Sequence, residues 1–121
     1  MAKKILVVDD EADILKAVTF RLKKSGYDVI EATDGQEALV LIREQGPHLI
    51  ILDLRLPIMS GWEVCRRIKS DDQFKHIPII LLTATAGAVN LSVTKELEIE
   101  GILVKPFEPE ELLEKVKKLL G

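Results

Sequence analysis

Residues 5–10 read Ile5-Leu-Val-Val-Asp-Asp10, a run of aliphatic side chains followed at once by two aspartates. A short, continuous apolar run is typical of a strand that is covered on both faces, as strands of parallel sheets are. The aspartates mark the end of that strand, because burying two adjacent charges is costly. The stretch therefore predicts a buried strand with carboxylates at its carboxyl end.

The same pattern recurs along the chain. Continuous apolar runs follow at 49–52, 79–82 and 102–104, and a briefer one, Val29-Ile30, lies between two acidic residues. Segments in which apolar residues keep a helical spacing separate these runs. The apolar positions that predict the helices are Ile14, Ala17, Val18 and Leu22, then Ala38, Leu41 and Ile42, then Trp62, Cys65 and Ile68, and finally Leu112, Leu113, Val116, Leu119 and Leu120.

Residues that favour helix ends stand at the borders of these segments. Asp34 is a good N-cap, and Ser60 or Gly61 opens the helix that follows the third run. Pro109 suits the first turn of the last helix. Ser25-Gly26 and Gly46-Pro47 close the first two helices, because glycine favours the position after a helix and proline cannot continue one.

Residues 86–100 form the ambiguous segment. Val89, Val93 and Leu97 keep a helical spacing of four, whereas Val89, Leu91 and Val93 also alternate as in a strand. Two parallel strands need a crossover connection, which is usually a helix. We therefore predict a helix across 86–100.

Five repeats of strand then helix predict a parallel sheet with right-handed crossovers and helices on both faces. The expected fold class is α/β, a doubly wound five-stranded sheet of flavodoxin-like size. A chain of 121 residues has room for one such core. We expect residues 1–121 to form a single domain, with no output domain.

Composition argues against several classes of protein. A net charge of -3 and an aromatic content of 4% disfavour direct binding of nucleic acid. No stretch approaches the roughly 20 apolar residues of a membrane span, and the N-terminus lacks the apolar region of a signal peptide. The single cysteine, Cys65, fits a reducing compartment, and His48 and His76 lie too scattered for a zinc site. We expect a cytoplasmic protein with no membrane partner.

Polar residues stand at the ends of four of the five expected strands. They are Asp9-Asp10, Asp53, Thr83 and Lys105. Each has an ordinary explanation when taken alone: a helix cap, a turn residue or a surface lysine. Ligands of open α/β sheets, however, bind outside the carboxyl ends of the strands, so these side chains are expected to converge there.

The chemistry of that set is specific. Three carboxylates in one cleft repel one another unless a cation lies between them, and Mg²⁺ prefers such carboxylates together with waters and phosphate oxygens. Lys105 adds a positive charge and Thr83 a hydroxyl group. A carboxylate nucleophile with these partners describes a phosphoryl-transfer site.

Four motifs in order make the whole chain resemble the receiver domains of two-component response regulators. They are Val-Asp-Asp-Glu at 8–11, Asp53-Leu-Arg-Leu-Pro-Ile-Met-Ser-Gly61, Leu82-Thr-Ala84 and Val104-Lys-Pro-Phe107. The resemblance implies the strand order 2-1-3-4-5. It also implies a signalling switch that takes a phosphoryl group from a histidine kinase or phosphotransfer protein and then changes its affinity for a downstream protein.

The resemblance also assigns roles to residues of this chain. Asp53 would be the phosphoacceptor, and Mg²⁺ or Mn²⁺ would be held by Asp10 directly, by Asp9 through water, by Asp53 and by the backbone carbonyl of Arg55. Thr83 would bond a phosphoryl oxygen, Lys105 would pair with the phosphoryl group, and Ala84 would keep the entrance open. The Lys105-Pro106 peptide would be cis. The chain would catalyse only its own phosphoryl transfer and dephosphorylation.

Some positions depart from the family pattern. Receivers commonly carry Tyr or Phe three residues before the lysine, where this chain has Ile102. Arg55 and Thr85 occupy positions that tune dephosphorylation in the family. Ile102 keeps open an alternative, a phosphorylation-independent interaction module. A third reading, a phosphohydrolase with an aspartyl nucleophile, needs a second acid where the chain has Arg55.

Overall fold

The structure, a computed structural model, describes residues 2–85, 87 and 89–121. Five parallel strands form one sheet in the order β2-β1-β3-β4-β5. The expected fold class and strand order are confirmed. The strands are β1 (Lys4–Val8), β2 (Asp28–Ala32), β3 (Leu49–Asp53), β4 (Ile79–Thr83) and β5 (Gly101–Val104).

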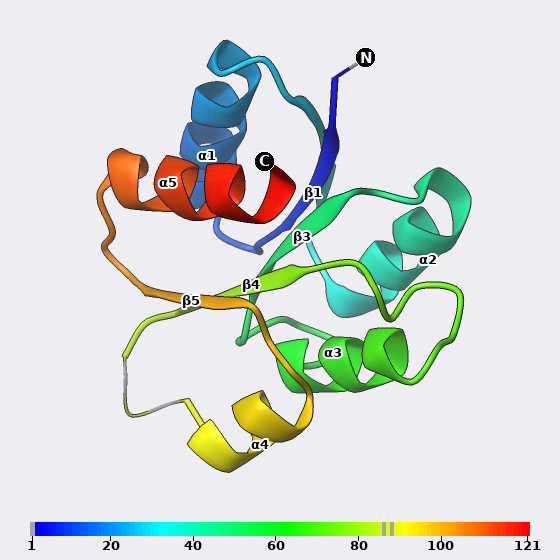
Figure 1. Ribbon diagram of the computed structural model, residues 1–121. Helices are drawn as coiled ribbons and strands as arrows, with labels where there is room; N and C mark the ends of the chain where they lie inside the picture. The colour runs from blue at the N-terminus through cyan, green and yellow to red at the C-terminus, as the bar shows by residue number, and fades with distance from the viewer. Residues whose placement is uncertain (1, 86, 88) are drawn as a thin grey trace.

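Helices cover both faces of the sheet (Figure 1). α1 (Ala12–Lys24) and α5 (Pro109–Leu120) lie on one face, and α2 (Gly35–Gln45), α3 (Gly61–Lys69) and α4 (Leu91–Glu96) lie on the other. Each face has its own apolar core, in which alternate residues of a strand point to opposite sides. Ile5 and Val7 pack toward α1 and α5, whereas Leu6 and Val8 pack toward α2 and α3.

The central strands carry continuous apolar runs because both of their faces are buried. Every residue of β3 and of β4 is buried, which confirms the interpretation of these runs. The helix N-caps predicted at Asp34 and Ser60 are also confirmed. Asp34 accepts a hydrogen bond from the N–H of Glu37 at 2.7 Å, and Ser60 accepts one from Glu63 at 3.3 Å. Pro109 occupies the first turn of α5.

The helix predicted across 86–100 is correct in type but wrong in extent. α4 covers only Leu91–Glu96, and two positions of the predicted span, 86 and 88, lie outside the described residues. The Asn90 side chain accepts from the N–H of Val93 and so begins the helix late. At the other end Glu98 has a φ of 56° and the N–H of Ile99 donates back to the carbonyl of Thr94, a pattern that closes a helix.

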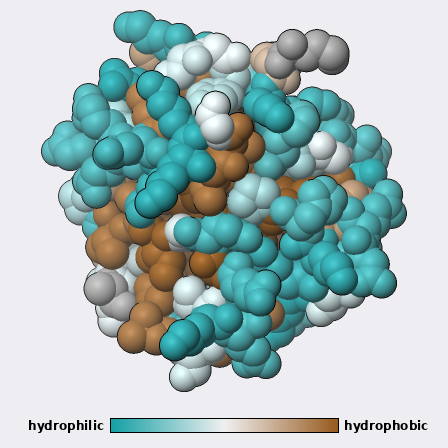
Figure 2. Space-filling model, viewed as in Figure 1, coloured by the Kyte–Doolittle hydropathy of each residue, from teal (hydrophilic) through white to brown (hydrophobic). Residues whose placement is uncertain are grey.

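α4 buries no residue of its own. Val89, Leu97 and Ile102 are partly buried and pack against the core under α2 and α3. Apolar residues gather on the surface over β5 beside α4 (Figure 2), where Leu91 and Val104 are exposed. Of the three residues whose spacing of four predicted a longer helix, Val93 lies within α4, whereas Val89 and Leu97 pack against the core from either side of it.

Cys65 is fully buried in α3, as expected for a small apolar side chain. Burial raises the pKa of the Cys65 thiol to about 12. We expect an alkylating reagent at pH 8 to modify the native protein at least about a hundredfold more slowly than the unfolded chain, because thiolate is the reactive form. Mass spectrometry of timed samples with and without denaturant measures the ratio, and equal rates would contradict the buried position.

Among the described residues, no helix combines the length and the apolar character needed to cross a membrane.

Candidate functional site

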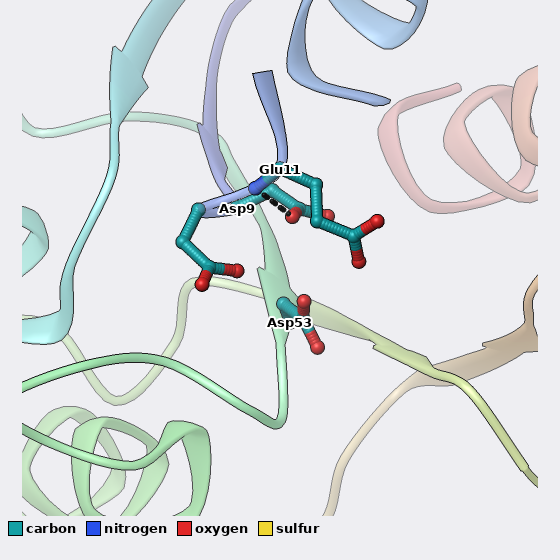
Figure 3. Close-up of side chains that lie close together, drawn as sticks. Asp9, Glu11 and Asp53 are labelled. Atoms are coloured by element: carbon teal, nitrogen blue, oxygen red, sulfur yellow. Dashed lines mark hydrogen bonds between the residues drawn. The ribbon is translucent and has the colours of Figure 1, made fainter. Parts of the chain in front are cut away.

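The carboxyl ends of β1 and β3 meet at the centre of the sheet, because these strands are neighbours and parallel. Asp9 and Asp10 follow β1, Glu11 precedes α1, and Asp53 ends β3. One carboxylate oxygen from each of these four residues lies within 4.8 Å of the others. Figure 3 shows Asp9, Glu11 and Asp53 converging from the two strand ends. The predicted convergence of Asp9, Asp10 and Asp53 is therefore confirmed in position.

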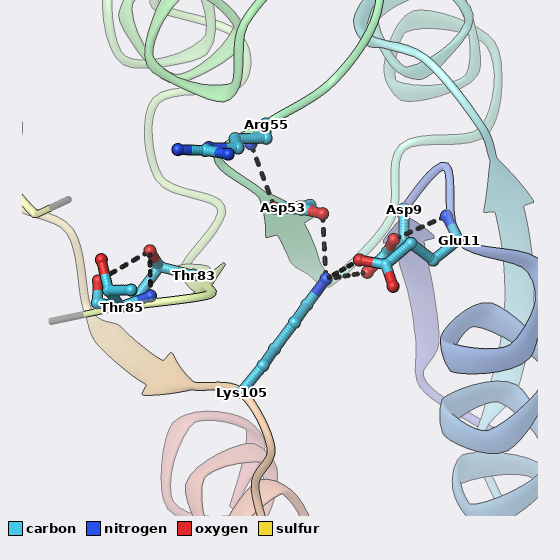
Figure 4. Close-up of polar contacts among 7 residues, drawn as sticks. All are labelled: Asp9, Glu11, Asp53, Arg55, Thr83, Thr85 and Lys105. Carbon is cyan, nitrogen blue, oxygen red and sulfur yellow. Dashed lines mark hydrogen bonds and ion pairs between the residues drawn. The ribbon is translucent and has the colours of Figure 1, made fainter.

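Lys105 reaches this cluster from the end of β5 (Figure 4). Its Nζ lies 2.9 Å from Asp9 Oδ2, 3.0 Å from Asp53 Oδ2 and 3.2 Å from Glu11 Oε1. Asp9 is fully buried and Asp53 is 4% exposed. Two carboxylates that are withdrawn from water thus share one ammonium group.

The two buried carboxylates are bonded alike. Asp9 Oδ1 accepts the N–H of Glu11 at 2.9 Å, and Asp53 Oδ1 accepts the N–H of Arg55 at 3.0 Å, while Lys105 bonds the other oxygen of each. These bonds fix the orientation of both groups. No buried side-chain nitrogen or oxygen among the described residues lacks a hydrogen-bond partner.

Burial and hydrogen bonding have opposite effects on the pKa values of Asp9 and Lys105. Burial raises the pKa of Asp9, although bonds to the Glu11 N–H and to Lys105 act in the opposite direction. Burial by itself lowers the pKa of Lys105, but its bonds to Asp9 and Asp53 outweigh this and the net pKa is raised. The structure therefore holds a charged lysine against the Asp9 carboxylate, whose ionisation burial disfavours.

The loop from β3 to α3 holds Asp53 by close backbone packing. A Cβ atom added to Gly61 would lie 2.4 Å from the carbonyl oxygen of Asp53 and 2.8 Å from the Cα of Leu54. The N–H of Gly61 donates to the carbonyl of Leu54 at 3.0 Å. Only glycine permits this approach, so Gly61 fixes where the loop returns past Asp53.

A strained turn lies in the same loop. The N–H of Met59 donates to the carbonyl of Pro57 at 2.7 Å, and Ile58 between them has a φ of 71° and is 76% exposed. This γ-turn places a β-branched residue in a conformation that L-residues rarely adopt.

We expect Ile58→Gly to raise the free energy of unfolding by roughly 0.5–1 kcal/mol, because relief of the left-handed strain exceeds the added entropy of glycine in the unfolded chain. Urea denaturation measures it. Ile58→Ala keeps a Cβ and is the control, with a smaller gain expected. A loss of stability in Ile58→Gly would show that the Ile58 side chain contributes more than its exposure indicates.

The donor set fits a hard divalent cation. All four candidate ligands are carboxylates, which Mg²⁺ prefers, and two of them, Asp10 and Glu11, are exposed, which leaves room for water ligands. A cation there would also reduce the repulsion among the carboxylates. The residues present are thus suited to hold Mg²⁺ or Mn²⁺.

The family model for the response regulator receiver domain matches residues 5–117, which include every residue of the cluster. The chain belongs to this family. Receiver domains act in two-component signalling, so the resemblance seen in the sequence motifs is confirmed.

Individual relatives agree with the assignment. The receiver is 42% identical over 120 residues to the alkaline phosphatase synthesis transcriptional regulatory protein PhoP of Bacillus subtilis, covering 99% of this chain and 49% of that protein. It spans about half the length of the curated relatives it matches. The chemotaxis response regulator CheY4 of Vibrio cholerae superposes with a TM-score of 0.91 at 34% identity, covering 98% of this chain and 99% of that one.

A further solved structure is the BeF3-activated DrrB receiver domain, with a TM-score of 0.85 and 36% identity over 99% of this chain and 98% of that one.

The resemblance to receiver domains also led us to expect a cis Lys105-Pro106 peptide and assigned roles to Thr83 and Arg55. The Lys105-Pro106 peptide is cis, as the resemblance implied. The Thr83 hydroxyl donates to the carbonyl of Thr85 at 3.0 Å, and the N–H of Thr85 approaches it at 3.4 Å. Thr83 ends β4 at the same edge of the sheet, but its hydroxyl is engaged in its own loop (Figure 4), and no hydrogen bond among the described residues joins it to the cluster. The Arg55 side chain extends away from Lys105 in the same view.

The sequence interpretation assigned no role to Glu11. The residue stands in the Val-Asp-Asp-Glu motif, and it both joins the acidic cluster and pairs with Lys105. Its position directly after the strand-ending aspartates was the available signal. Glu11 also lines a cavity of about 480 Å³ that opens between α1 and α5 and is otherwise mostly apolar.

Proposed function

We propose that this receiver accepts a phosphoryl group on Asp53 from a histidine kinase or phosphotransfer protein, in the presence of Mg²⁺ or Mn²⁺, and that the modified form changes its affinity for a downstream protein. The observation that carries the proposal is the buried Asp53 carboxylate held 3.0 Å from Lys105 Nζ inside a cluster of acids. Such a group is oriented, partly desolvated and provided with a cation to balance the incoming charge.

The transfer uses the two oxygens of Asp53 differently. One oxygen attacks the phosphorus, a P–O bond forms, and the P–N bond to the donor imidazole breaks with its electron pair left on nitrogen. The Arg55 N–H holds the other oxygen in place. Lys105 then shifts its bond from the carboxylate to a phosphoryl oxygen. Mg²⁺, when bound, supplies charge neutralisation for the carboxylates and the phosphoryl oxygens.

The metal site in this proposal comprises Asp9, Asp10, Asp53 and the carbonyl oxygen of Arg55. Asp10 is exposed beside the two buried aspartates, which leaves it free to bind a cation directly. The backbone of Arg55 is already fixed by its bond to Asp53.

The proposed output uses Thr83. Its hydroxyl is bonded to Thr85, so a new bond to a phosphoryl oxygen requires the loop after β4 to release it. We infer that phosphorylation shifts this loop, and with it the weakly anchored α4. The downstream protein would then read the changed surface.

The alternative is a phosphorylation-independent interaction module, which Ile102 favours. Ile102 is partly buried against the core where many receivers carry an aromatic ring, so ring rotation is not available as a switch. The two proposals differ in the amide spectrum. Switching requires shifts across residues 83–105 when a phosphoryl mimic binds, whereas the alternative predicts mimic binding with that region unchanged.

Binding of beryllofluoride, a phosphoryl mimic, tests the proposed site. We expect a bound ¹⁹F signal in the wild-type protein that requires Mg²⁺ and is lost in Asp53→Asn. Asp28→Asn is the matched control, because Asp28 is an exposed carboxylate at the amino end of β2 and is expected to leave binding unchanged. A Mg²⁺-independent signal, or an equal signal in Asp53→Asn, would overturn the proposal.

A further inference from the structure

Glu11 occupies the N-cap position of α1 without capping it. The Glu11 side chain makes no hydrogen bond to the first turn of the helix, although capping is the usual role of a polar residue there. The carboxylate instead points to Lys105, with Oε1 3.2 Å from Nζ (Figure 4). The Glu11 side chain is 59% exposed, whereas that of Lys105 is 11% exposed. Glu11 thus approaches the lysine from the solvent side of the site.

The Glu11 carboxylate adds a negative charge on the solvent side of the site. Lys105 already bonds Asp9 and Asp53, so the bond to Glu11 divides one ammonium among three carboxylates. Asp10 brings the cluster to four carboxylates, so that with one ammonium and one divalent cation the site would still carry one net negative charge. Without Glu11, the charges of the other three carboxylates, Lys105 and the cation would sum to zero, so the net repulsion that an incoming anion meets comes from Glu11.

We propose that Glu11 is a selectivity residue that makes this site discriminate among phosphoryl donors by their negative charge, disfavouring a small dianion more than a monoanion. The inference rests on the proposed phosphorylation of Asp53. Glu11 acts at the entrance and by occupying Lys105, not by contact with the donor's leaving group. A phosphoryl donor that is presented by a protein gains affinity from contacts outside the site, so the charge of Glu11 affects its transfer rate less.

Two small phosphoryl donors, acetyl phosphate and phosphoramidate, transfer the same group but differ in net charge. With acetyl phosphate, an Asp53 oxygen attacks phosphorus, the P–O bond to the acyl oxygen breaks, and acetate leaves with the electron pair. With phosphoramidate, whose nitrogen already carries its protons, the P–N bond breaks and ammonia leaves with the electron pair. Both give the same aspartyl phosphate, but at pH 7 acetyl phosphate is a dianion and phosphoramidate a net monoanion.

Glu11→Gln keeps the size of the side chain and removes its charge. At a separation of about 5–6 Å in a water-like dielectric, Coulomb's law gives a gain of about threefold for a monoanion and about tenfold for a dianion. We expect the rate of Asp53 phosphorylation to rise in that proportion, and the gain to shrink as salt is raised. Asp13→Asn removes the same charge from an exposed position two residues further along α1 and is the matched control.

The experiment measures phosphorylation by intact mass with each donor and beryllofluoride affinity by ¹⁹F NMR, both with Mg²⁺, in the wild type, Glu11→Gln and Asp13→Asn. A larger gain for acetyl phosphate than for phosphoramidate, with about threefold tighter beryllofluoride binding in Glu11→Gln alone, supports the role. Equal gains for both donors, no gain, or the same gain in Asp13→Asn overturn it while leaving the proposed function intact. Absence of phosphorylation and of mimic binding in every variant overturns both.

Discussion

Gly61→Ala is expected to lower the free energy of unfolding by about 3 kcal/mol, the upper part of the range for an overpacked position. The added Cβ would lie 2.4 Å from the carbonyl oxygen of Asp53 and 2.8 Å from the Cα of Leu54, and both are backbone atoms that cannot rotate away. Relief requires the loop to move away from the end of β3. Urea denaturation followed by circular dichroism measures the change.

Gly87→Ala is the matched control for Gly61→Ala. A Cβ at Gly87 would meet no atom of the other described residues within 4 Å, so the expected change is small. Equal effects of the two substitutions would mean that general backbone entropy, not the contact with Asp53, sets the cost. A tolerated Gly61→Ala would contradict the packing of the loop around the site.

Lys105→Met is expected to lower the free energy of unfolding by about 3 kcal/mol at pH 7 without divalent cations, because removing one partner of a buried ion pair leaves its counterpart uncompensated. Here the buried counterparts are Asp9 and Asp53. Lys75→Met is the control, since Lys75 pairs with the exposed Asp72 and such surface pairs contribute little. Denaturation in EDTA compares the variants, and equal small losses would contradict a shared buried ammonium.

Lys105 and Asp9 each make the free energy of unfolding of the wild-type protein depend on pH in a defined direction. The pKa of Lys105 is raised in the folded protein, so its contribution is fully present below the ordinary lysine pKa of about 10.4 and is lost as the pH rises through the folded pKa. The pKa of Asp9 is raised by burial, so its contribution to stability increases as the pH falls through the folded pKa toward 3.8. Comparison of the wild type with Asp9→Asn across this acid range isolates the second effect.

The strands and the site's main residues could be predicted because they follow from strong local signals. Continuous apolar runs such as Leu49–Leu52 identify strands buried on both faces, and in a parallel sheet the polar residues that end such strands must meet at one edge. Asp9, Asp53 and Lys105 were located in this way, and distances of 2.9 Å and 3.0 Å agree with it.

Other features depend on tertiary packing and could not be read from local pattern. The length of α4 is set by the Asn90 cap and by the turn at Glu98, while Val89 and Leu97 pack on the sheet from outside the helix. The γ-turn at Ile58 has no sequence signal, because β-branched residues normally avoid it. Glu11 belongs to a motif, but its choice of Lys105 over its own helix end appears only in three dimensions.

The central claim is that Asp53 is the phosphoacceptor of this receiver domain. The most direct test is the mass of the protein after incubation with phosphoramidate and Mg²⁺, followed by location of the modification among its peptides. The account predicts a gain of one phosphoryl group on the peptide that contains Asp53, dependent on Mg²⁺ and lost in Asp53→Asn. An unmodified wild-type protein, or the same gain in Asp53→Asn, would contradict it.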